Sequence, residues 1–185
     1  FARIAAAQGA NVVLAARRFD RLAQVAGELR DSGLSATAVA MDVVSQSSTA
    51  AAFDHAESEF GTVDSVIANA GIEKSGPSVA IAPDDFEKVF NVNVKGVFLT
   101  ACEAARRLQQ AEAAARGRIV LISSITARKC YPGAAPYSAS KAAVSHLGRL
   151  LACEWARTGP NVICVSPGYI ASDLVADWVA SEGGL

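Results

Sequence analysis

The chain has 185 residues, of which 51% are hydrophobic and 19% charged, and its formal net charge is −1. These values predict one folded α/β domain over residues 1–185. The near-zero charge gives no basis for binding nucleic acid or an acidic membrane surface, and no apolar run is as long as a membrane span. The four cysteines lie far apart without a CxxC pair. This spacing predicts no metal site and no disulfide framework, and favours a reducing, cytoplasmic setting.

Apolar runs of strand length alternate with longer segments in which apolar residues recur at helical spacing. The expected strands are, in chain order, 10–16, 35–41, 63–71, 118–124 and 161–166. The expected helices run from Phe19 towards Gly33, over 45–60, from Pro83 through Arg116, and over 137–157, with one more capped by Ser172. Three of these helices are followed by a glycine, which commonly ends a helix.

Alternating helices and continuously apolar strands indicate a parallel sheet that is covered on both faces. Right-handed crossovers then give a doubly wound, Rossmann-like sheet in three αβα layers, with ligands outside the carboxyl ends of the strands. The chain opens on an apolar helical segment and stops just after a helix begins. We therefore expect a domain truncated at both ends, with a strand and a turn preceding Phe1.

Tyr137 and Lys141 lie four residues apart on an expected helix, so their side chains share one face. An ammonium beside a phenol stabilises the phenolate, lowers the pKa of the phenol and makes it a usable proton donor and acceptor near neutral pH. The nearby Tyr131 has Ala135, and not a lysine, at the matching position. A YxxxK pair alone is a weak signal, because such pairs also arise by chance on solvated surfaces.

Two further polar positions fall near this pair. Ser123 and Ser124 end an expected strand, and strand alternation turns them to opposite faces, so only one can point at a given ligand. Asn93 falls close to the buried face of an apolar helix pattern, where an amide needs hydrogen-bond partners. Asn93 is therefore either a structural pin or part of a water relay.

The residues after the strand at 10–16 bear on cofactor choice. NAD-selective sites place an acidic residue there for the ribose hydroxyls, whereas this chain has Ala16 followed by Arg17 and Arg18. A guanidinium can pair with a 2′-phosphate in a bidentate manner. The sequence therefore favours NADP(H) over NAD(H), and the alternative is two solvated arginines at a helix start.

Several motifs together resemble the short-chain dehydrogenase/reductase family over essentially the whole chain. They are NAG at 69–71, NVNVKGVF at 91–98, GRIVLISS at 117–124, YSASK at 137–141 and SPGYIASD at 166–173. They occur in the family's order and spacing. The resemblance implies an NADP(H)-preferring carbonyl reductase, similar to 3-oxoacyl-[acyl-carrier-protein] reductases, that acts on a small alcohol or ketone. The family's glycine-rich turn, which holds the pyrophosphate, would precede Phe1.

The resemblance also implies roles for individual residues. Tyr137 would be the acid/base, and Lys141 would lower its pKa and hold the nicotinamide ribose. Ser124 would hydrogen-bond the substrate carbonyl, and Asn93 would hold a relay water. Beyond Arg17 and Arg18, the implied cofactor contacts are Asp42, Val43, Asn69, Ala70, Gly71, Tyr137, Lys141, Pro167, Gly168, Ile170 and Ser172.

The helices 84–116 and 137–157 carry apolar residues on more than one face, so each must bury a second face. By the resemblance they form the interface of a homodimer or homotetramer, and a crowded monomer core is the alternative. Two other functions stay open at this point. One is a non-catalytic nucleotide-binding or interaction protein, and the other is an epimerase or dehydratase that uses a bound nucleotide catalytically.

Overall fold

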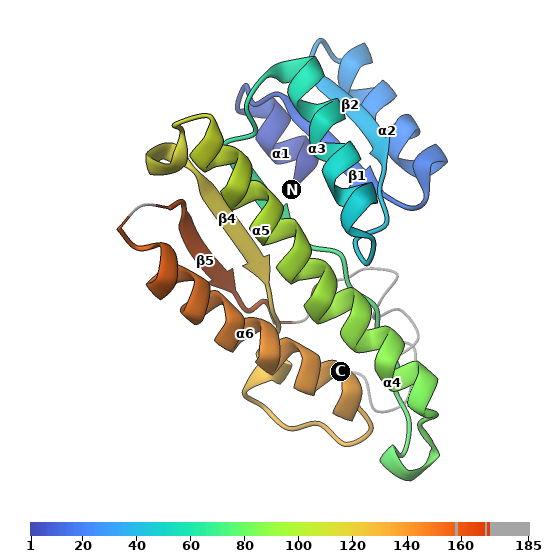
Figure 1. The fold of residues 1–185 in the computed structure, drawn as a ribbon. Coiled ribbons are helices and arrows are strands. Elements are labelled where there is room, and N and C mark those ends of the chain that lie inside the picture. The colour runs from blue at the N-terminus through green and yellow to red at the C-terminus, as the bar shows by residue number, and fades with distance from the viewer. Residues whose placement is uncertain (158, 169, 171–185) are drawn as a thin grey trace.

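A computed structural model describes residues 1–157, 159–168 and 170, and the helix expected at Ser172 lies outside them. Strands and helices alternate along the chain (Figure 1). The strands are β1 (Val12–Ala16), β2 (Ala36–Ala40), β3 (Ser65–Ala68), β4 (Arg118–Ile122) and β5 (Asn161–Val165). The α-helices are α1 (Ala2–Ala7), α2 (Phe19–Asp31), α3 (Gln46–Phe60), α4 (Pro83–Phe90), α5 (Gly96–Gln110) and α6 (Ala135–Trp155). The short helices are η1 (Ser78–Ala80), η2 (Asn91–Lys95), η3 (Ala114–Arg116) and η4 (Ile125–Ala127).

The strands pair in parallel but form two sheets within the described residues. β1 pairs with β2, and the second sheet has the order β3-β4-β5. In the second sheet, Arg118 of β4 lies opposite Ser65 on one side and Asn161 on the other. The Rossmann-like α/β class is thus confirmed. The expectation of one continuous sheet is not met, because β1 and β3 are not hydrogen-bonded to each other.

Helices cover both faces of the β1-β2 sheet, which gives three layers there. Ala36 of β2 packs in one hydrophobic cluster with residues of α1 and α2. Val39, which points to the opposite face, packs against a second cluster that contains Ala52 of α3. This sheet therefore matches the expected αβα order.

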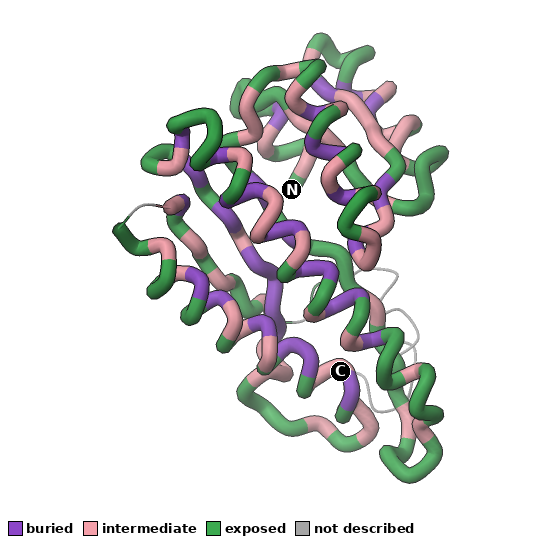
Figure 2. The backbone as a smooth tube through the Cα atoms, viewed as in Figure 1, coloured by how far each residue is buried: buried purple, intermediate pink, exposed green. Residues whose placement is uncertain are grey.

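The β3-β4-β5 sheet packs one face against α5 and α6 (Figure 1). Figure 2 shows buried positions along β4 and along the sides of α5 and α6 that face it. Ile119 and Leu121 of β4 are fully buried in the main cluster, together with Val144 of α6. On the opposite face, Ile67 and Ile163 are 42% and 47% exposed. β4 thus packs against α5 and α6 through the same face of its sheet.

A serine cap and a glycine explain the two ends of α3. Ser45 caps α3, since its Oγ accepts a hydrogen bond from the Ser48 N–H at 3.2 Å. Gly61 follows α3 with a φ of 77°, in the left-handed region where glycine is favoured. The beginning and the end of this helix are as predicted from the sequence.

The expected single helix from Pro83 through Arg116 is wrong in two respects. The helical chain widens at η2, a π-helix that separates α4 from α5. α5 then ends at Gln110, because Glu112 adopts a φ of 53°, and only the short turn η3 follows. α6 begins at Ala135, two residues before the expected start, with Pro136 in its first turn.

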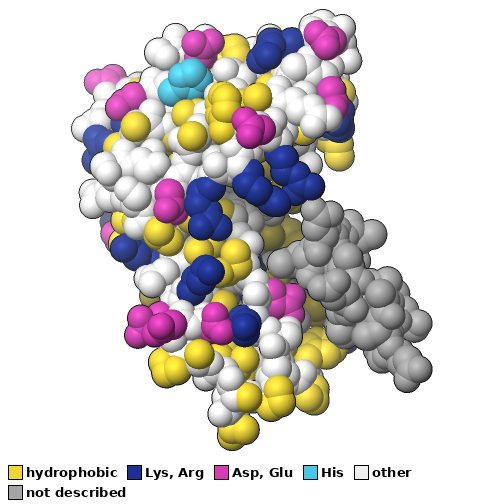
Figure 3. Space-filling view, turned by 90° about the vertical axis from the view of Figure 1, so that its right-hand side faces the viewer, with side chains coloured by type: hydrophobic (Ala, Val, Ile, Leu, Met, Phe, Trp, Pro, Cys, Tyr) yellow, Lys and Arg dark blue, Asp and Glu magenta, His cyan; other side chains and the backbone are white. Residues whose placement is uncertain are grey.

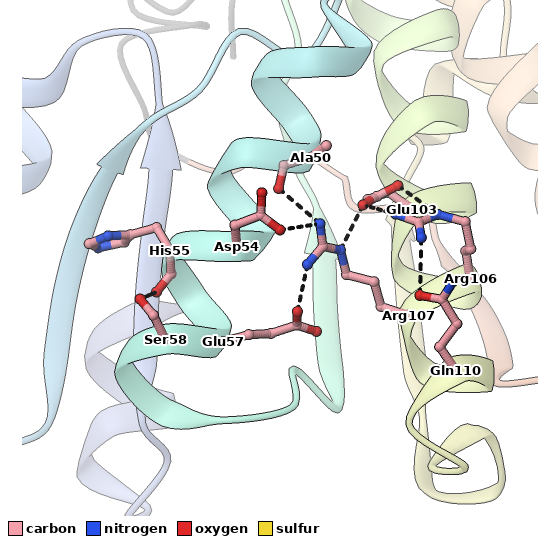
Figure 4. A network of polar contacts seen from close by, with 9 residues as sticks. All are labelled: Ala50, Asp54, His55, Glu57, Ser58, Glu103, Arg106, Arg107 and Gln110. Carbon is pink, nitrogen blue, oxygen red and sulfur yellow. Dashed lines mark hydrogen bonds and ion pairs between the residues drawn. The ribbon is translucent and has the colours of Figure 1, made fainter.

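A partly buried arginine joins α3 to α5 (Figure 4). Arg107 of α5 pairs with Glu57 at 2.5 Å and Asp54 at 2.6 Å, both on α3, and with Glu103 at 2.6 Å on its own helix. It also donates to the carbonyl of Ala50 at 3.1 Å. Because α3 packs on the β1-β2 sheet and α5 on the other sheet, this network ties together the two halves whose sheets do not pair.

Candidate active site

Three of the expected catalytic side chains meet beyond the carboxyl end of β4. Tyr137 and Lys141 share one face of α6, and the Lys141 Nζ lies 5.6 Å from the centre of the Tyr137 ring. Ser124 stands two residues after the last residue of β4 and is hydrogen-bonded to Tyr137. The end of β4 and one face of α6 therefore bring together Ser124, Tyr137 and Lys141, three residues that the sequence analysis identified.

The neighbouring serines point to different surroundings, as strand alternation predicts. The Ser123 Oγ donates to the carbonyl of Lys141 at 2.8 Å and lies 2.7 Å from the Ser145 Oγ, so it fastens β4 to α6. The Ser124 Oγ accepts from the Thr126 N–H at 3.2 Å and faces Tyr137. Of the two, Ser124 is the serine that belongs to the candidate site.

The ionisation of Tyr137 differs from the expectation. Burial raises the pKa of Tyr137, the hydrogen bond with Ser124 lowers it, and the charge of Glu73 raises it, with a net rise. Lys141 does not contribute to this net rise. Its Nζ donates to the carbonyl of Ile122 at 2.8 Å. Burial in turn lowers the pKa of Lys141 to about 8. Lys141 is thus a buried cation that loses its proton close to neutral pH.

Asn93 is fully buried in η2, and the protein uses both donors of its amide. The Oδ1 accepts from the Ile72 N–H at 2.8 Å, and the Nδ2 donates to the Ile72 carbonyl at 2.9 Å and to the Ser140 Oγ at 2.9 Å. This is the geometry of a structural pin. Ser140 was missed by the sequence reasoning, although its place three residues after Tyr137 puts it on a neighbouring part of the helix face.

The NAG turn at 69–71 runs past this pin. A Cβ atom at Gly71 would lie 3.5 Å from both the Asn93 Oδ1 and the Lys141 Nζ, so glycine keeps the backbone close to the polar groups. Asn69, Ala70 and Gly71 are all exposed. The turn therefore presents open backbone directly beside Lys141, as a nucleotide-binding segment requires.

The two residues after β2 are held by local contacts. The Asp42 Oδ1 accepts from the Val44 N–H at 3.2 Å, and the Asp42 N–H donates to the Ser48 Oγ at 2.9 Å. Val43 is buried against Gly96, where a Cβ atom would lie only 2.7 Å from the Val43 Cγ2. Asp42 and Val43 thus form a fixed edge between β2 and the start of α5.

Arg17 and Arg18 follow β1 and are both exposed. Within residues 1–157, 159–168 and 170, neither guanidinium is paired with a carboxylate. Figure 3 shows Lys and Arg side chains gathered in the middle of one face of the molecule. Exposed guanidinium groups and an open glycine backbone are both groups that can bind phosphate.

The remaining expected cofactor contacts follow β5. The carbonyl of Pro167 accepts from the Ile125 N–H at 2.9 Å, which links this segment to η4. Gly168 is exposed and Ile170 is 63% exposed. Ser172 lies outside the described residues.

An open groove and a loop contact border the site. The groove has a volume of about 460 Å³ and lies between the starts of α4 and α6, lined by Ser78, Ile81, Pro83, Phe86, Glu87, Ala135 and Pro136. It stops at Pro136, the residue before Tyr137. The Gly76 N–H donates to the Gly133 carbonyl at 2.9 Å, so the loop after the NAG turn is fastened to the loop before Tyr137.

A parallel α/β fold with Ser124, Tyr137 and Lys141 at the strand end defines a class, the NAD(P)-dependent oxidoreductases of Rossmann type. Comparison with known proteins makes the assignment specific. Residues 1–183 match the family model for short chain dehydrogenase. The chain belongs to the short-chain dehydrogenase family.

Two curated relatives and one solved structure illustrate the match. Gluconate 5-dehydrogenase of Gluconobacter oxydans is 32% identical over 94% of this chain and 67% of the relative. A chloroplastic NADPH-dependent aldehyde reductase-like protein of Arabidopsis thaliana is 39% identical over 84% of this chain and 57% of the relative. The crystal structure of a gluconate 5-dehydrogenase from Burkholderia cenocepacia, in complex with NADP and tartrate, superposes with a TM-score of 0.89 at 33% identity. That alignment covers 98% of this chain and 70% of the crystallised one.

The chain therefore spans roughly 57% to 70% of the length of these three proteins. In the part of the chain that the structure describes, no helix is long and apolar enough to cross a membrane.

Proposed function

We propose that the protein transfers a hydride between NADP(H) and an alcohol or ketone substrate. The observation that carries this proposal is the convergence of Ser124, Tyr137 and Lys141 beside the open NAG backbone. The named relatives are dehydrogenases and reductases, which supports the same reaction type. We propose a single NAD(P)-binding domain over residues 1–185.

The roles of the side chains follow from where charge develops. The nicotinamide, when bound, supplies or accepts the hydride. In the reductive direction Tyr137 donates its phenolic proton to the substrate oxygen, while Ser124 donates a hydrogen bond to the same oxygen. Lys141 lies between the tyrosine and the NAG turn, and in the complex with cofactor its ammonium would hold the ribose hydroxyls and stabilise the phenolate that remains, an effect that the protein alone does not show. Asn93 would hold the water that returns a proton to Lys141. Because both amide donors are used by Ile72 and Ser140, that water would meet the Asn93 backbone carbonyl or the Oδ1.

NADP(H) is the proposed cofactor because of the end of β1. The position at which an NAD-selective site carries a carboxylate is Ala16 in this chain, and the next residue, Arg17, offers an exposed guanidinium. Arg18 adds a second positive charge beside it. The names of two similar proteins mention NADP or NADPH, which supports the same preference here.

We propose that two or four copies associate through α4–α5 and α6. Phe98 on α5 and Leu150 on α6 are 44% and 53% exposed, which leaves apolar surface on helices that already pack on the core. Light scattering of the purified protein gives the mass, and so the number of copies in the assembly.

All four cysteines are free thiols, which supports a location in the reducing environment of the cytoplasm.

The Tyr137→Phe variant tests the reaction. NADPH oxidation is followed with a panel of ketones and 3-oxoacyl thioesters, and cofactor binding is measured by titration. We expect Tyr137→Phe to bind NADPH normally and to lose at least about 100-fold in kcat, because general acid catalysis contributes roughly that much. Tyr131→Phe removes the same oxygen from the adjacent loop and should keep most of the turnover. Near-normal turnover in Tyr137→Phe would sink the assignment.

A further inference from the structure

Ser140 occupies a buried junction that the proposed reaction does not yet use. Its side chain is fully buried, and its Oγ donates to the Tyr137 carbonyl at 2.6 Å. The same oxygen accepts from the Asn93 Nδ2 at 2.9 Å. A hydroxyl has one proton to donate, so both bonds are made without conflict only when Asn93 is the donor.

This junction fixes which way the Asn93 amide faces. With one Nδ2 proton on Ser140 and the other on the Ile72 carbonyl, the Oδ1 is left to accept from the Ile72 N–H. A flipped amide would set its oxygen against the Ile72 carbonyl. Ser140 therefore supports the two-bond clamp that Asn93 places on Ile72.

The clamp acts on the backbone that adjoins Lys141. Ile72 directly follows Gly71, and a Cβ atom at Gly71 would lie 3.5 Å from the Lys141 Nζ. Hydrogen bonds thus run from the first turn of α6, through Ser140 and Asn93, to the end of the NAG turn. They connect the helix that carries Tyr137 and Lys141 to the segment proposed to follow the cofactor.

We propose that Ser140 is a positioning residue of this site. It acts through Asn93 to hold the NAG turn in register with Tyr137 and Lys141, so that cofactor and acid/base group stay aligned. The proposal rests on the proposed hydride-transfer function, but the register it describes is a property of the fold. It can therefore be measured with and without turnover.

Hydrogen exchange gives the readout that does not depend on activity. In Ser140→Ala the Asn93 amide loses an acceptor and is free to turn, so the Ile72 N–H should exchange at least about tenfold faster. Thr49→Val is the matched control, because the Thr49 Oγ1 is equally buried and donates to the Ser45 carbonyl at 3.0 Å, away from the site. This control should leave Ile72 exchange unchanged. Unchanged exchange at Ile72 in a folded Ser140→Ala protein overturns the proposal.

Kinetic measurements test whether Ser140 affects turnover by way of the Asn93 side chain. Per folded enzyme, Ser140→Ala should lower kcat and raise the KM for NADPH, each by about three- to tenfold, since misalignment affects both. In a double-mutant cycle, Ser140→Ala combined with Asn93→Ser should be no slower than Asn93→Ser alone. Additive losses would mean that Ser140 acts by another route and would refute the proposal.

A third variant covers the case in which Ser140→Ala does not fold. Ser140→Cys keeps nearly the same volume with a weaker donor and acceptor, so it should give intermediate Ile72 exchange. Wild-type exchange at Ile72 in Ser140→Cys counts against the proposal. If the wild-type protein binds NADPH but reduces no substrate, the proposed function fails, while the exchange experiment still decides the role of Ser140.

Discussion

Lys141 should make the folded protein less stable at neutral pH than an uncharged side chain of similar length would. The residue is only 3% exposed, and its Nζ donates to the Ile122 carbonyl at 2.8 Å. Burial lowers the pKa of Lys141 from 10.5 to about 8. Since one pKa unit is worth about 1.4 kcal/mol, the proton on buried Lys141 costs the fold roughly 3 kcal/mol at pH 7. Replacement by Met removes this cost and gives up a hydrogen bond worth about 1 kcal/mol, so Lys141→Met should be more stable by about 2 kcal/mol.

The pH dependence makes this prediction sharper. The folded protein releases the Lys141 proton near the lowered pKa of about 8, whereas the unfolded chain keeps it up to about 10.5. Between these values the unfolded state binds more protons, so the stability of the wild type rises with pH. Lys141→Met has no such proton. Its advantage should therefore shrink by about 1.4 kcal/mol between pH 7 and pH 9.

Urea unfolding followed by tryptophan fluorescence at both pH values measures the two differences. Lys129→Met, at an exposed position, is the control and should follow the wild type at both pH values. An advantage of Lys141→Met that is the same at pH 7 and pH 9 would refute the reasoning, because it would show that Lys141 does not titrate differently in the fold. Lys141→Met should also lose activity, which would make Lys141 a residue kept for function at the expense of stability.

Two further predictions concern charged residues outside the catalytic set. Arg107→Met leaves the 10%-exposed Glu103 carboxylate with fewer partners and should lower the free energy of unfolding by about 2 kcal/mol at pH 7. Burial raises the pKa of Glu103, but the hydrogen bonds from Arg106 and Arg107 outweigh it and lower the pKa. The wild type should therefore lose this stability as pH falls below about 4. Urea titrations measure the difference in the free energy of unfolding between the wild type and Arg107→Met. A difference that stays constant down to pH 3 would contradict the network. Arg17→Asp should weaken NADPH binding by about 10- to 100-fold and leave NADH binding nearly unchanged in calorimetric titrations; an unchanged preference would remove Arg17 from the site.

Local sequence signals were enough for much of the fold and of the candidate site. The alternation of apolar runs located all five strands of the described residues. Ser45 and Gly61 marked the two ends of α3, because caps and left-handed turns depend on few neighbours. Helical spacing put Tyr137 and Lys141 on one face, and the period of two along a strand separated Ser123 from Ser124. Each of these features depends on residues close together in the chain.

The features that escaped prediction depend on contacts between distant segments. The π-helix η2 interrupts the expected long helix without disturbing its apolar pattern, so periodicity could not reveal it. Ser140 is hydrogen-bonded to Asn93, which lies 47 residues earlier in the chain, and no residue near Ser140 in the sequence indicates that partner. The pKa of Tyr137 is raised, opposite to the expectation, because burial, which only the folded structure determines, outweighs the hydrogen bond with Ser124 that lowers it.

The buried polar residues show where the fold accepts a cost in stability. Seven polar or charged residues are buried in the described part of the chain, and five of them lie at the site or directly beside it: Asn93, Ser123, Ser124, Ser140 and Lys141. The core around them, with Leu121 and Val144, is otherwise apolar. Burying a polar group lowers stability unless its hydrogen bonds are replaced, and here most are replaced by backbone carbonyls and N–H groups. Such bonds restrict the direction of each side chain, so the same contacts that offset desolvation also hold the NAG turn, Ser124 and Tyr137 in the fixed relation that the proposed proton transfer needs.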